Sequence, residues 1–211
     1  MFTNATYLIN LKRRPDRLEA ALARCSAVGI TPTVVEAVDG ETAPYPRNWN
    51  TRLSRGSLGC TLSHRAVLAL ALDRGAEEVT VFEDDVIFGP DFVARHELFR
   101  ESIPDNWQGL MLGGIHCRRP EPVRPGVVRC RRTDATHAYT LRGDYIRKVH
   151  YAWSIFPTDC SYTFAGLHNW SRVYAPERWL CGQGANRSDI SGSNVPFDRW
   201  WQWPPYPKHE P

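Results

Sequence analysis

The chain has 211 residues, 42% of them hydrophobic, and a formal net charge of +3 at pH 7. This length and apolar content suffice for a single α/β domain with its own core, and we expect residues 1–211 to form one, with a Pro- and Trp-rich tail from about residue 192. The weak positive charge is compatible with an anionic substrate but is not that of a nucleic-acid-binding protein.

The N-terminus lacks the pattern of a signal peptide, and no run approaches the ~20 apolar residues of a membrane span. The six cysteines are far apart in the sequence, with no Cys-x-x-Cys pair and no histidine spaced as a zinc partner. We therefore expect a soluble, cytoplasmic protein with reduced thiols.

Residues 5–11 are an apolar, β-prone run, and helical spacing of apolar residues begins after Pro15. Proline suits the first turn of a helix, so Arg13, Arg14 and Arg17 are expected near a helix N-terminus, where phosphate groups bind. The same arginines would also fit a solvated loop, and these residues alone do not decide between the two.

Residues 33–38 predict a second strand, which ends at Asp39 and Gly40. An acid in this position can bind a ribose hydroxyl, although Asp-Gly is also an ordinary turn. A helix is predicted from Gly56 to Arg74. Within it Ser63 and His64 are adjacent, so their side chains point about 100° apart and do not form a nucleophile and base pair; His64 is better explained as a core or pocket residue.

The stretch Val79–Phe88 is the most informative in the chain, because three consecutive acids interrupt an apolar, β-branched and aromatic run. The run predicts a buried strand, and carboxylates at its end repel one another unless a cation or hydrogen-bond donors lie among them. A hard divalent ion such as Mg²⁺ or Mn²⁺ meets that need. The alternative is an ordinary solvated strand end.

The second half of the chain predicts shorter elements. Helices are expected over residues 90–99 and 143–150, and strands over residues 109–114, 135–141, 172–176 and 179–181. The Pro- and Arg-rich segment 118–132 is expected to be an excursion from the core, a solvated loop or a surface facing an anionic acceptor. The aromatic residues 197–207 could stack on sugars or simply cover the core.

Four motifs in order closely resemble glycosyltransferase family 25, which includes bacterial lipooligosaccharide galactosyltransferases and procollagen galactosyltransferases. They are Ile9-Asn10-Leu11-Lys12-Arg13-Arg14-Pro15-Asp16-Arg17, Glu36-Ala37-Val38-Asp39-Gly40, Gly56-x-x-Gly59-Cys60-x-Leu62-Ser63-His64 and Val81-Phe82-Glu83-Asp84-Asp85. Later segments around His137, Asp159, Gln183 and Asp189 are similar to weaker blocks of the family.

The resemblance implies a GT-A-like α/β fold with a mostly parallel, Rossmann-like sheet flanked by helices. It also implies a UDP-hexose donor, a divalent metal (Mn²⁺ or Mg²⁺) and inversion at the anomeric carbon. Asp85, with Asp84, is the expected metal ligand. The expected donor-binding residues are Asn10, Arg13, Arg14, Arg17, Asp39, Gly40, Gly59, Ser63, His64, Glu83, Asp84 and Gln183.

Inversion by direct displacement also requires a general base for the acceptor hydroxyl. Asp159 is the first candidate and Asp189 the second. The chain departs from the family by its short length, its compressed segment between Gly40 and Gly56 and its Trp-rich tail, so the acceptor stays open among a saccharide, a protein and a modified nucleobase. Two other functions use the same residues: a nucleotide-sugar-binding protein without activity, and a metal-dependent phosphoesterase.

Overall fold

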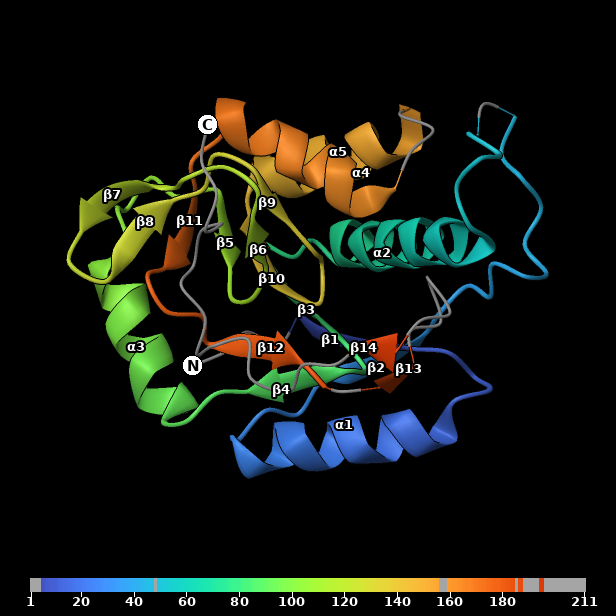
Figure 1. The fold of residues 1–211 in the computed structure, drawn as a ribbon, viewed down its shortest axis with the longest axis horizontal. Helices are drawn as coiled ribbons and strands as arrows, with labels where there is room; N and C mark the ends of the chain where they lie inside the picture. Colours follow the sequence, from blue (N-terminus) through green and yellow to red (C-terminus); the bar gives the residue numbers. More distant parts are fainter. Residues whose placement is uncertain (1–4, 48, 156–158, 185, 188–193, 196–211) are drawn as a thin grey trace.

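An eight-stranded mixed sheet lies at the centre of the molecule, with helices on both faces (Figure 1). The computed structural model describes residues 5–47, 49–155, 159–184, 186–187 and 194–195. The strand order is β2-β1-β3-β10-β5-β11-β8-β7. These strands are β1 (Thr6–Asn10), β2 (Thr33–Glu36), β3 (Glu78–Glu83), β5 (Gly109–Met111), β7 (Glu121–Arg124), β8 (Val127–Arg129), β10 (Ala138–Arg142) and β11 (Val173–Pro176).

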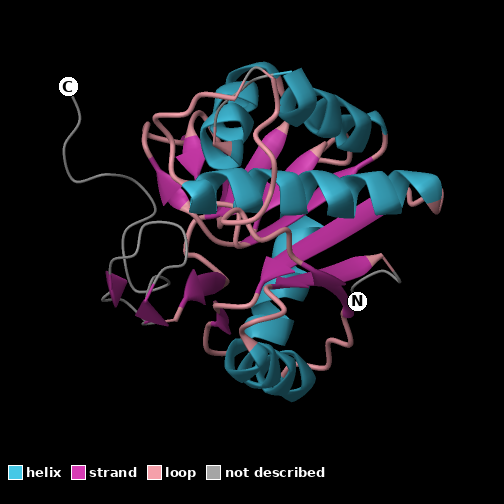
Figure 2. Ribbon diagram, turned by 90° about the vertical axis from the view of Figure 1, so that its right-hand side faces the viewer, coloured by secondary structure: helices cyan, strands magenta, loops and turns pink. Residues whose placement is uncertain are grey.

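In the described part of the chain five α-helices cover the sheet. Figures 1 and 2 show their arrangement on its two faces. One face packs against α2 (Arg55–Asp73), α4 (Asp144–Ile155) and α5 (Cys160–Leu167). The other packs against α1 (Pro15–Ala27) and α3 (Phe92–Ser102). The predicted α/β class, a sheet flanked by helices, is therefore confirmed.

Alternation along the central strands divides the apolar residues between two cores, one on each face. In β3, Val79 and Val81 belong to the core under α2 and α4, whereas Phe82 belongs to the core under α1 and α3. In β1, Tyr7 and Leu8 divide in the same way. This period of two is what a strand buried on both faces requires, and it decides which face each later residue of the strand reaches.

Local sequence explains where the first two large helices begin. Pro15 occupies the first turn of α1, where its missing N–H leaves no helical hydrogen bond unmade. Ser54 caps α2, its Oγ accepting a hydrogen bond from the backbone N–H of Ser57 at 3.0 Å. Gly29, with φ of 73°, ends the first helix, because the left-handed region is open to glycine without strain.

The stretch of residues 79–88 is not one strand but is divided into two strands at its carboxylates. β3 ends at Glu83, Asp84 and Asp85 form a turn, and β4 (Val86–Phe88) leaves the main sheet to pair with β12 (Cys181–Gln183). β1 pairs in parallel with β2 on one side and with β3 on the other. The carboxyl ends of these three strands consequently meet at one edge, which is where open α/β sheets bind ligands.

Three sequence predictions require correction. Only three of the seven strand pairings in the described sheet are parallel, so the sheet is mixed rather than mostly parallel. Segment 118–132 is no excursion: it contains the β7–β8 hairpin at the sheet edge, and Val127, Val128 and Cys130 are buried. Helix α5 has no counterpart among the predicted elements, because its residues lack a clear apolar period.

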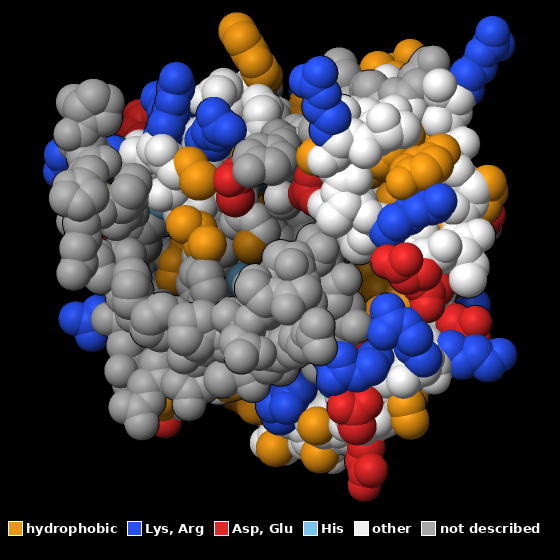
Figure 3. Space-filling view, turned by 45° about the vertical axis from the view of Figure 1, so that its right-hand side comes forward, with side chains coloured by type: hydrophobic (Ala, Val, Ile, Leu, Met, Phe, Trp, Pro, Cys, Tyr) orange, Lys and Arg blue, Asp and Glu red, His pale blue; other side chains and the backbone are white. Residues whose placement is uncertain are grey.

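The remaining described elements are two-residue strands and one short helix. These are β6 (Ile115–His116), β9 (Thr133–Asp134), β13 (Asn186–Arg187), β14 (Asn194–Val195) and the 3₁₀ helix η1 (His168–Trp170). No described helix combines the length and the apolar character that crossing a membrane requires. On the face drawn in Figure 3, basic side chains are interspersed with acidic ones rather than gathered into one broad patch. The tail from about residue 192 lies almost wholly outside the described residues.

Candidate active site

A cavity that is partly open to solvent lies at the carboxyl ends of β1, β2 and β3, against the first half of α2. The predicted site residues that line it are Asn10, Arg13, Arg17, Asp39, Gly40, Gly59, Ser63, His64, Glu83, Asp84, Asp85 and Gln183. They come from five separate segments of the chain. The parallel strands bring these segments to one place because their carboxyl ends share an edge of the sheet.

The acidic turn after β3 forms one wall of the cavity. Arg17, on α1, contacts both carboxylates of the turn, with its Nη2 3.3 Å from Asp85 Oδ2 and closer to Asp84 Oδ1. Gln183 Nε2 donates to the same Asp85 oxygen at 3.3 Å. The other oxygen, Asp85 Oδ1, is buried and has no hydrogen-bond partner among the described residues. Such an atom is costly unless something further binds it.

The electrostatic surroundings of Asp85 are unfavourable to its charge. Burial, together with the negative charges of Glu83 and Asp84, raises the pKa of Asp85 to about 7, and Arg17 offsets only part of this effect. A carboxylate held in this condition is stabilised by any cation that reaches it. The hard oxygen donors of Asp84 and Asp85 therefore fit a Mg²⁺ or Mn²⁺ ion.

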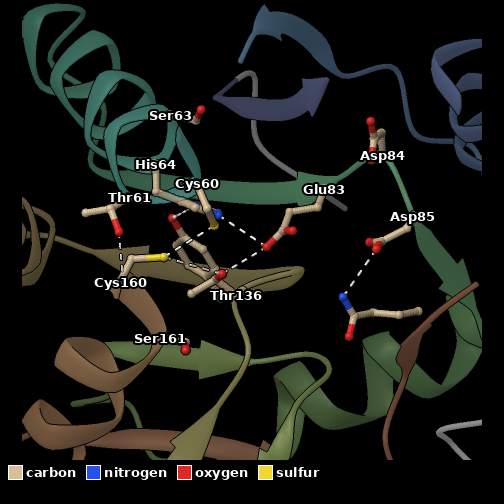
Figure 4. A network of polar contacts seen from close by, with 12 residues as sticks. Cys60, Thr61, Ser63, His64, Glu83, Asp84, Asp85, Thr136, Cys160 and Ser161 are labelled. Atoms are coloured by element: carbon tan, nitrogen blue, oxygen red, sulfur yellow. Dashed lines mark hydrogen bonds and ion pairs between the residues drawn. The ribbon is translucent and has the colours of Figure 1, made fainter. Parts of the chain in front are cut away.

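Glu83 faces the opposite way, into a hydrogen-bond network beneath α2 (Figure 4). Its Oε1 accepts from His64 Nε2 at 3.2 Å and from Thr136 Oγ1 at 2.9 Å. His64 Nδ1 lies 3.1 Å from the hydroxyl of Tyr139 on β10. Burial opposes ionisation of Glu83, but His64, His137 and Thr136 outweigh it and lower its pKa to about 2.

Ser63 joins the loop after β2 to α2. Its Oγ donates to the carbonyl of Gly59 at 2.6 Å and accepts from the backbone N–H of Val38 at 2.8 Å. Ser63 and His64 make no hydrogen bond to each other among those of the described chain, and each has its own partners, as expected for adjacent residues on a helix. The structure uses Ser63 to hold the cavity wall in position.

Two predicted glycines allow that loop and that helix to touch. A Cβ on Gly59 would lie 2.6 Å from the carbonyl oxygen of Val38 and 2.7 Å from the backbone nitrogen of Gly40. A Cβ on Gly40 would overlap the carbonyl of Arg55. Both obstacles are backbone atoms, which cannot move aside as a side chain would, so only glycine fits at these positions.

The opposite wall of the cavity carries polar groups at the ends of β1 and β2. Arg13 Nε donates to Asp39 Oδ2 at 2.8 Å, and this hydrogen bond lowers the pKa of the Asp39 carboxyl. Asn10 donates its amide nitrogen to the carbonyl of Leu11 at 2.8 Å. The amide oxygen of Asn10 is buried, with no partner among the described residues, and can accept a hydrogen bond from a ligand.

Three predicted residues are not placed in the cavity wall. Arg14 makes hydrogen bonds with Asp16, outside the cavity. Asp159 caps α5, where its Oδ1 accepts from both the backbone N–H and the hydroxyl of Ser161 at 2.9 and 2.7 Å. Asp189 lies outside the described residues.

Sequence reasoning missed one cluster beside the network. The sulfur atoms of Cys60 and Cys160 lie 3.5 Å apart, next to the imidazole of His64. The sequence has no Cys or His spacing typical of a zinc site, so short motifs do not reveal this cluster. Cys60 and His64 are four residues apart on one helix face, which could have signalled half of this cluster, but nothing local points to Cys160.

The profile of the family described as Glycosyltransferase family 25 (LPS biosynthesis protein) matches residues 3–125, more than half of the chain. The chain belongs to glycosyltransferase family 25. This membership confirms the resemblance of the four motifs, all of which fall within the matched residues. The cavity is built mainly from the same segment, with Gln183 contributed from further along the chain.

Individual relatives agree with the family assignment. Over 157 residues, 65% of the chain, identity with mouse procollagen galactosyltransferase 2 is 31%. Over 165 residues, 68% of the chain, identity with the human inactive glycosyltransferase 25 family member 3 is 33%. The aligned part is 25% of the mouse protein and 28% of the human one, so the chain spans about a quarter of the length of these curated relatives.

Among solved structures, a Drosophila β1,4-galactosyltransferase 7 mutant in complex with manganese, UDP-Gal and xylobiose matches 92% of the chain and 76% of its own, with a TM-score of 0.48 and 13% identity. A glycosyltransferase involved in glycosylating the major capsid protein of the virus PBCV-1 matches 71% of the chain and 65% of its own, with a TM-score of 0.42 and 14% identity. At these levels the likenesses have no bearing on activity.

Proposed function

We propose that this family 25 chain is a metal-dependent, inverting glycosyltransferase that moves a hexose from a UDP-sugar to an acceptor hydroxyl. The observation that carries the proposal is the acidic turn: Asp84 and Asp85 follow a central strand directly and line a cavity, and one buried oxygen of Asp85 has no partner among the described residues. Galactose is the preferred sugar, because one relative is a procollagen galactosyltransferase.

Asp84 and Asp85 would hold the Mn²⁺ or Mg²⁺ ion in this proposal. When bound, the ion neutralises the diphosphate and makes the nucleotide a better leaving group. Arg17 already contacts both carboxylates, so it is placed to bind a phosphate oxygen beside them. Gln183 keeps Asp85 in orientation through its 3.3 Å hydrogen bond.

The nucleoside would occupy the other end of the cavity. The amide oxygen of Asn10, which has no partner among the described residues, is suited to an N–H of the base, and Asp39, held in position by Arg13, is suited to a ribose hydroxyl. Gly40 and Gly59 let the two walls approach closely enough to enclose a flat ring. His64 and Glu83, joined by their hydrogen bond, also line this cavity.

The general base is assigned to Asp159, with Asp189 as the second candidate. For this role the Asp159 carboxylate must turn from Ser161 towards the acceptor, because its Oδ1 now accepts two hydrogen bonds there. A saccharide or a protein hydroxyl is the preferred acceptor, with a modified nucleobase as the third. Asp159→Asn should lower kcat for transfer without weakening donor binding.

The first test is the release of UDP from UDP-galactose and UDP-glucose, with Mn²⁺ and without it. We expect Asp85→Asn to abolish the metal-dependent release, because it removes the charge that holds the ion, while Asp144→Asn, at an acid whose side chain is 97% exposed, should leave it unchanged. Full turnover in the Asp85 variant would contradict the proposal. Release of phosphate from simple esters, with sugar nucleotides ignored, would favour the phosphoesterase instead.

A second candidate is a protein that binds the nucleotide sugar without transferring it. Two features favour it: a relative at 33% identity is named an inactive family member, and the candidate base Asp159 serves as a helix cap. A donor raises the apparent stability of whatever native state it binds. A Mn²⁺-dependent thermal shift with UDP-galactose, combined with no turnover across saccharide and peptide acceptors, would establish this candidate and exclude the first.

A further inference from the structure

The cavity has a second group of metal-ligating side chains, chemically unlike the acidic turn. Cys60 and His64 on α2 and Cys160 at the start of α5 bring two sulfur atoms and one imidazole nitrogen within 4.8 Å of one another. Cys60 and His64 also line the cavity, so the group can be reached from it. The oxygen donors of Asp84 and Asp85 suit hard ions, whereas thiolates and imidazole suit softer ones.

Hydrogen bonds position two of the three residues, Cys160 and His64. The backbone N–H of Cys160 donates to Thr61 Oγ1 at 3.0 Å, which fixes the start of α5 against α2. Its carbonyl accepts from Trp153 Nε1 at 2.9 Å. The position of Cys160 is thus determined on both sides of the residue. His64 is oriented by donation from Nε2 to Glu83, and an ion would bind Nδ1 in place of its contact with the Tyr139 hydroxyl.

The distances match a tetrahedral thiolate site. Two sulfurs each about 2.3 Å from a zinc ion are about 3.8 Å apart, and the Cys60 and Cys160 sulfurs are 3.5 Å apart. Catalytic zinc sites have this arrangement, with three protein ligands and a fourth position left open. Glu83 Oε1, 3.2 Å from His64 Nε2, lies beside the group as an oxygen donor.

Charge also favours a divalent ion here. Two thiolates and a neutral imidazole balance the two positive charges, so the occupied site adds no net charge to a buried region. A hydrogen bond with Cys160 and burial raise the pKa of the Cys60 thiol, and metal ions bind thiolates rather than thiols. Binding must therefore release protons and strengthen as the pH rises.

We propose that Cys60, Cys160 and His64 form a site for a thiophilic divalent ion, of the Zn²⁺ or Co²⁺ kind, separate from the ion proposed at Asp84 and Asp85. The inference does not depend on transferase activity. Because Cys60 and His64 are part of the cavity wall, an ion there alters the wall that also holds Glu83. A thiophilic metal bound at this site would consequently inhibit the binding of ligands in the cavity.

Cobalt provides a direct test, because Co²⁺ bound to thiolates absorbs through sulfur-to-metal charge transfer. The full chain, reduced and freed of metal, is titrated with Co²⁺, and the band is followed with the protons released. We expect one equivalent of Co²⁺ to bind and produce the band, and Zn²⁺ to displace the bound Co²⁺. Cys60→Ser and Cys160→Ser should each lose the band. Asp85→Asn should keep the band, which separates this site from the acidic turn, and so should Cys130→Ser, at a buried thiol outside the cluster.

Two results would overturn the proposal. One is the absence of the charge-transfer band in the reduced wild-type chain, or its survival in both cysteine variants. The other would come from mass spectrometry of the isolated protein without reductant. It is a stable peptide pair that joins Cys60 to Cys160 and is lighter by two hydrogens than the two separate peptides. That form would show that the paired sulfurs are a disulfide rather than metal ligands.

Discussion

Three consecutive carboxylates in this chain are divided between two different surroundings. Glu83 continues the inward-facing row of β3 and accepts hydrogen bonds from His64 and Thr136. Asp84 and Asp85 leave the strand and contact Arg17. Alternation along the strand separates their roles: Glu83 is a fixed part of the network under α2, whereas Asp85 keeps an oxygen with no described partner.

Asp85 should destabilise the fold as it ionises. Its pKa, about 7 in the folded chain and 3.8 as the reference value, means that the native state retains a proton that the unfolded state releases. Stability is therefore lost as the pH rises from about 4 towards 7. We expect Asp85→Asn to be more stable than wild type at pH 8, by an amount on the order of 1–3 kcal/mol, and equal to it near pH 4. Urea unfolding at several pH values measures this; a less stable variant at pH 8 would be the contrary result.

Glu83 should show the opposite sign. Its pKa is lowered from 4.5 to about 2, so the ionised form is the one that the native state stabilises. That stabilisation is present above pH 4.5 and is lost as the pH falls through about 2. We expect Glu83→Gln to be less stable than wild type at pH 7, by an amount on the order of 1–3 kcal/mol, with the difference shrinking below pH 4.5. Equal stabilities at pH 7 would show that the network contributes nothing.

At the scale of elements, the cavity depends on the contact between the loop after β2 and helix α2. The backbone of Gly40 and the carbonyl of Val38 lie directly against Gly59, and Ser63 holds the same loop with two hydrogen bonds. This contact sets the separation of two cavity walls. Glycine is required there by the short distance between backbones, although a helix interior ordinarily disfavours it.

Two helical glycines allow a matched test. Gly59→Ala should destabilise the protein by several kcal/mol and weaken UDP-sugar binding, because the added methyl group would overlap backbone atoms. Gly166→Ala, in α5, should be neutral or stabilising by about 0.5–1 kcal/mol, because beyond its own helix backbone and chain neighbours no described atom lies within 4 Å of the new methyl group. Chemical unfolding of both variants measures the difference. Equal effects would show that α2 can shift away from the loop at no cost.

Across the whole molecule, one sheet separates two apolar cores, and the cavity draws on elements from both sides. Arg17 belongs to α1 on one face and His64 to α2 on the other. Each core packs on the same central strands, β1, β3 and β10. We propose on this ground that the chain is a single domain in which neither core persists without the other.

A single domain of this kind should unfold in one cooperative step. Tryptophan fluorescence and far-UV circular dichroism should give the same midpoint in urea, since Trp153 lies in one core and Trp107 in the other. A saturating donor with Mn²⁺ should move both midpoints together. Two separate transitions would show that the halves fold independently.

Much of the site was predictable because it lies in contiguous motifs. Strand ends, the proline that begins α1, and the acids interrupting an apolar run each follow from local rules of propensity and charge. These rules placed Asn10, Asp39 and Asp85 at the carboxyl ends of predicted strands, and parallel pairing brings such ends together. The family motifs then indicated the chemistry.

The sequence by itself determined the central strands, the two helices around the cavity and the identity of the acids, because all of these depend on residues close together in the chain. Only the tertiary structure decided which partner each acid has. It attached Glu83 to His64, Arg17 to the acidic turn and Cys160 to Cys60, 100 residues away. It also made β8 a strand of the main sheet, because pairing with β11 buries the inner strand of a hairpin whose composition suggests a loop. Contacts between distant segments have no local pattern, so their geometry had to come from the folded chain.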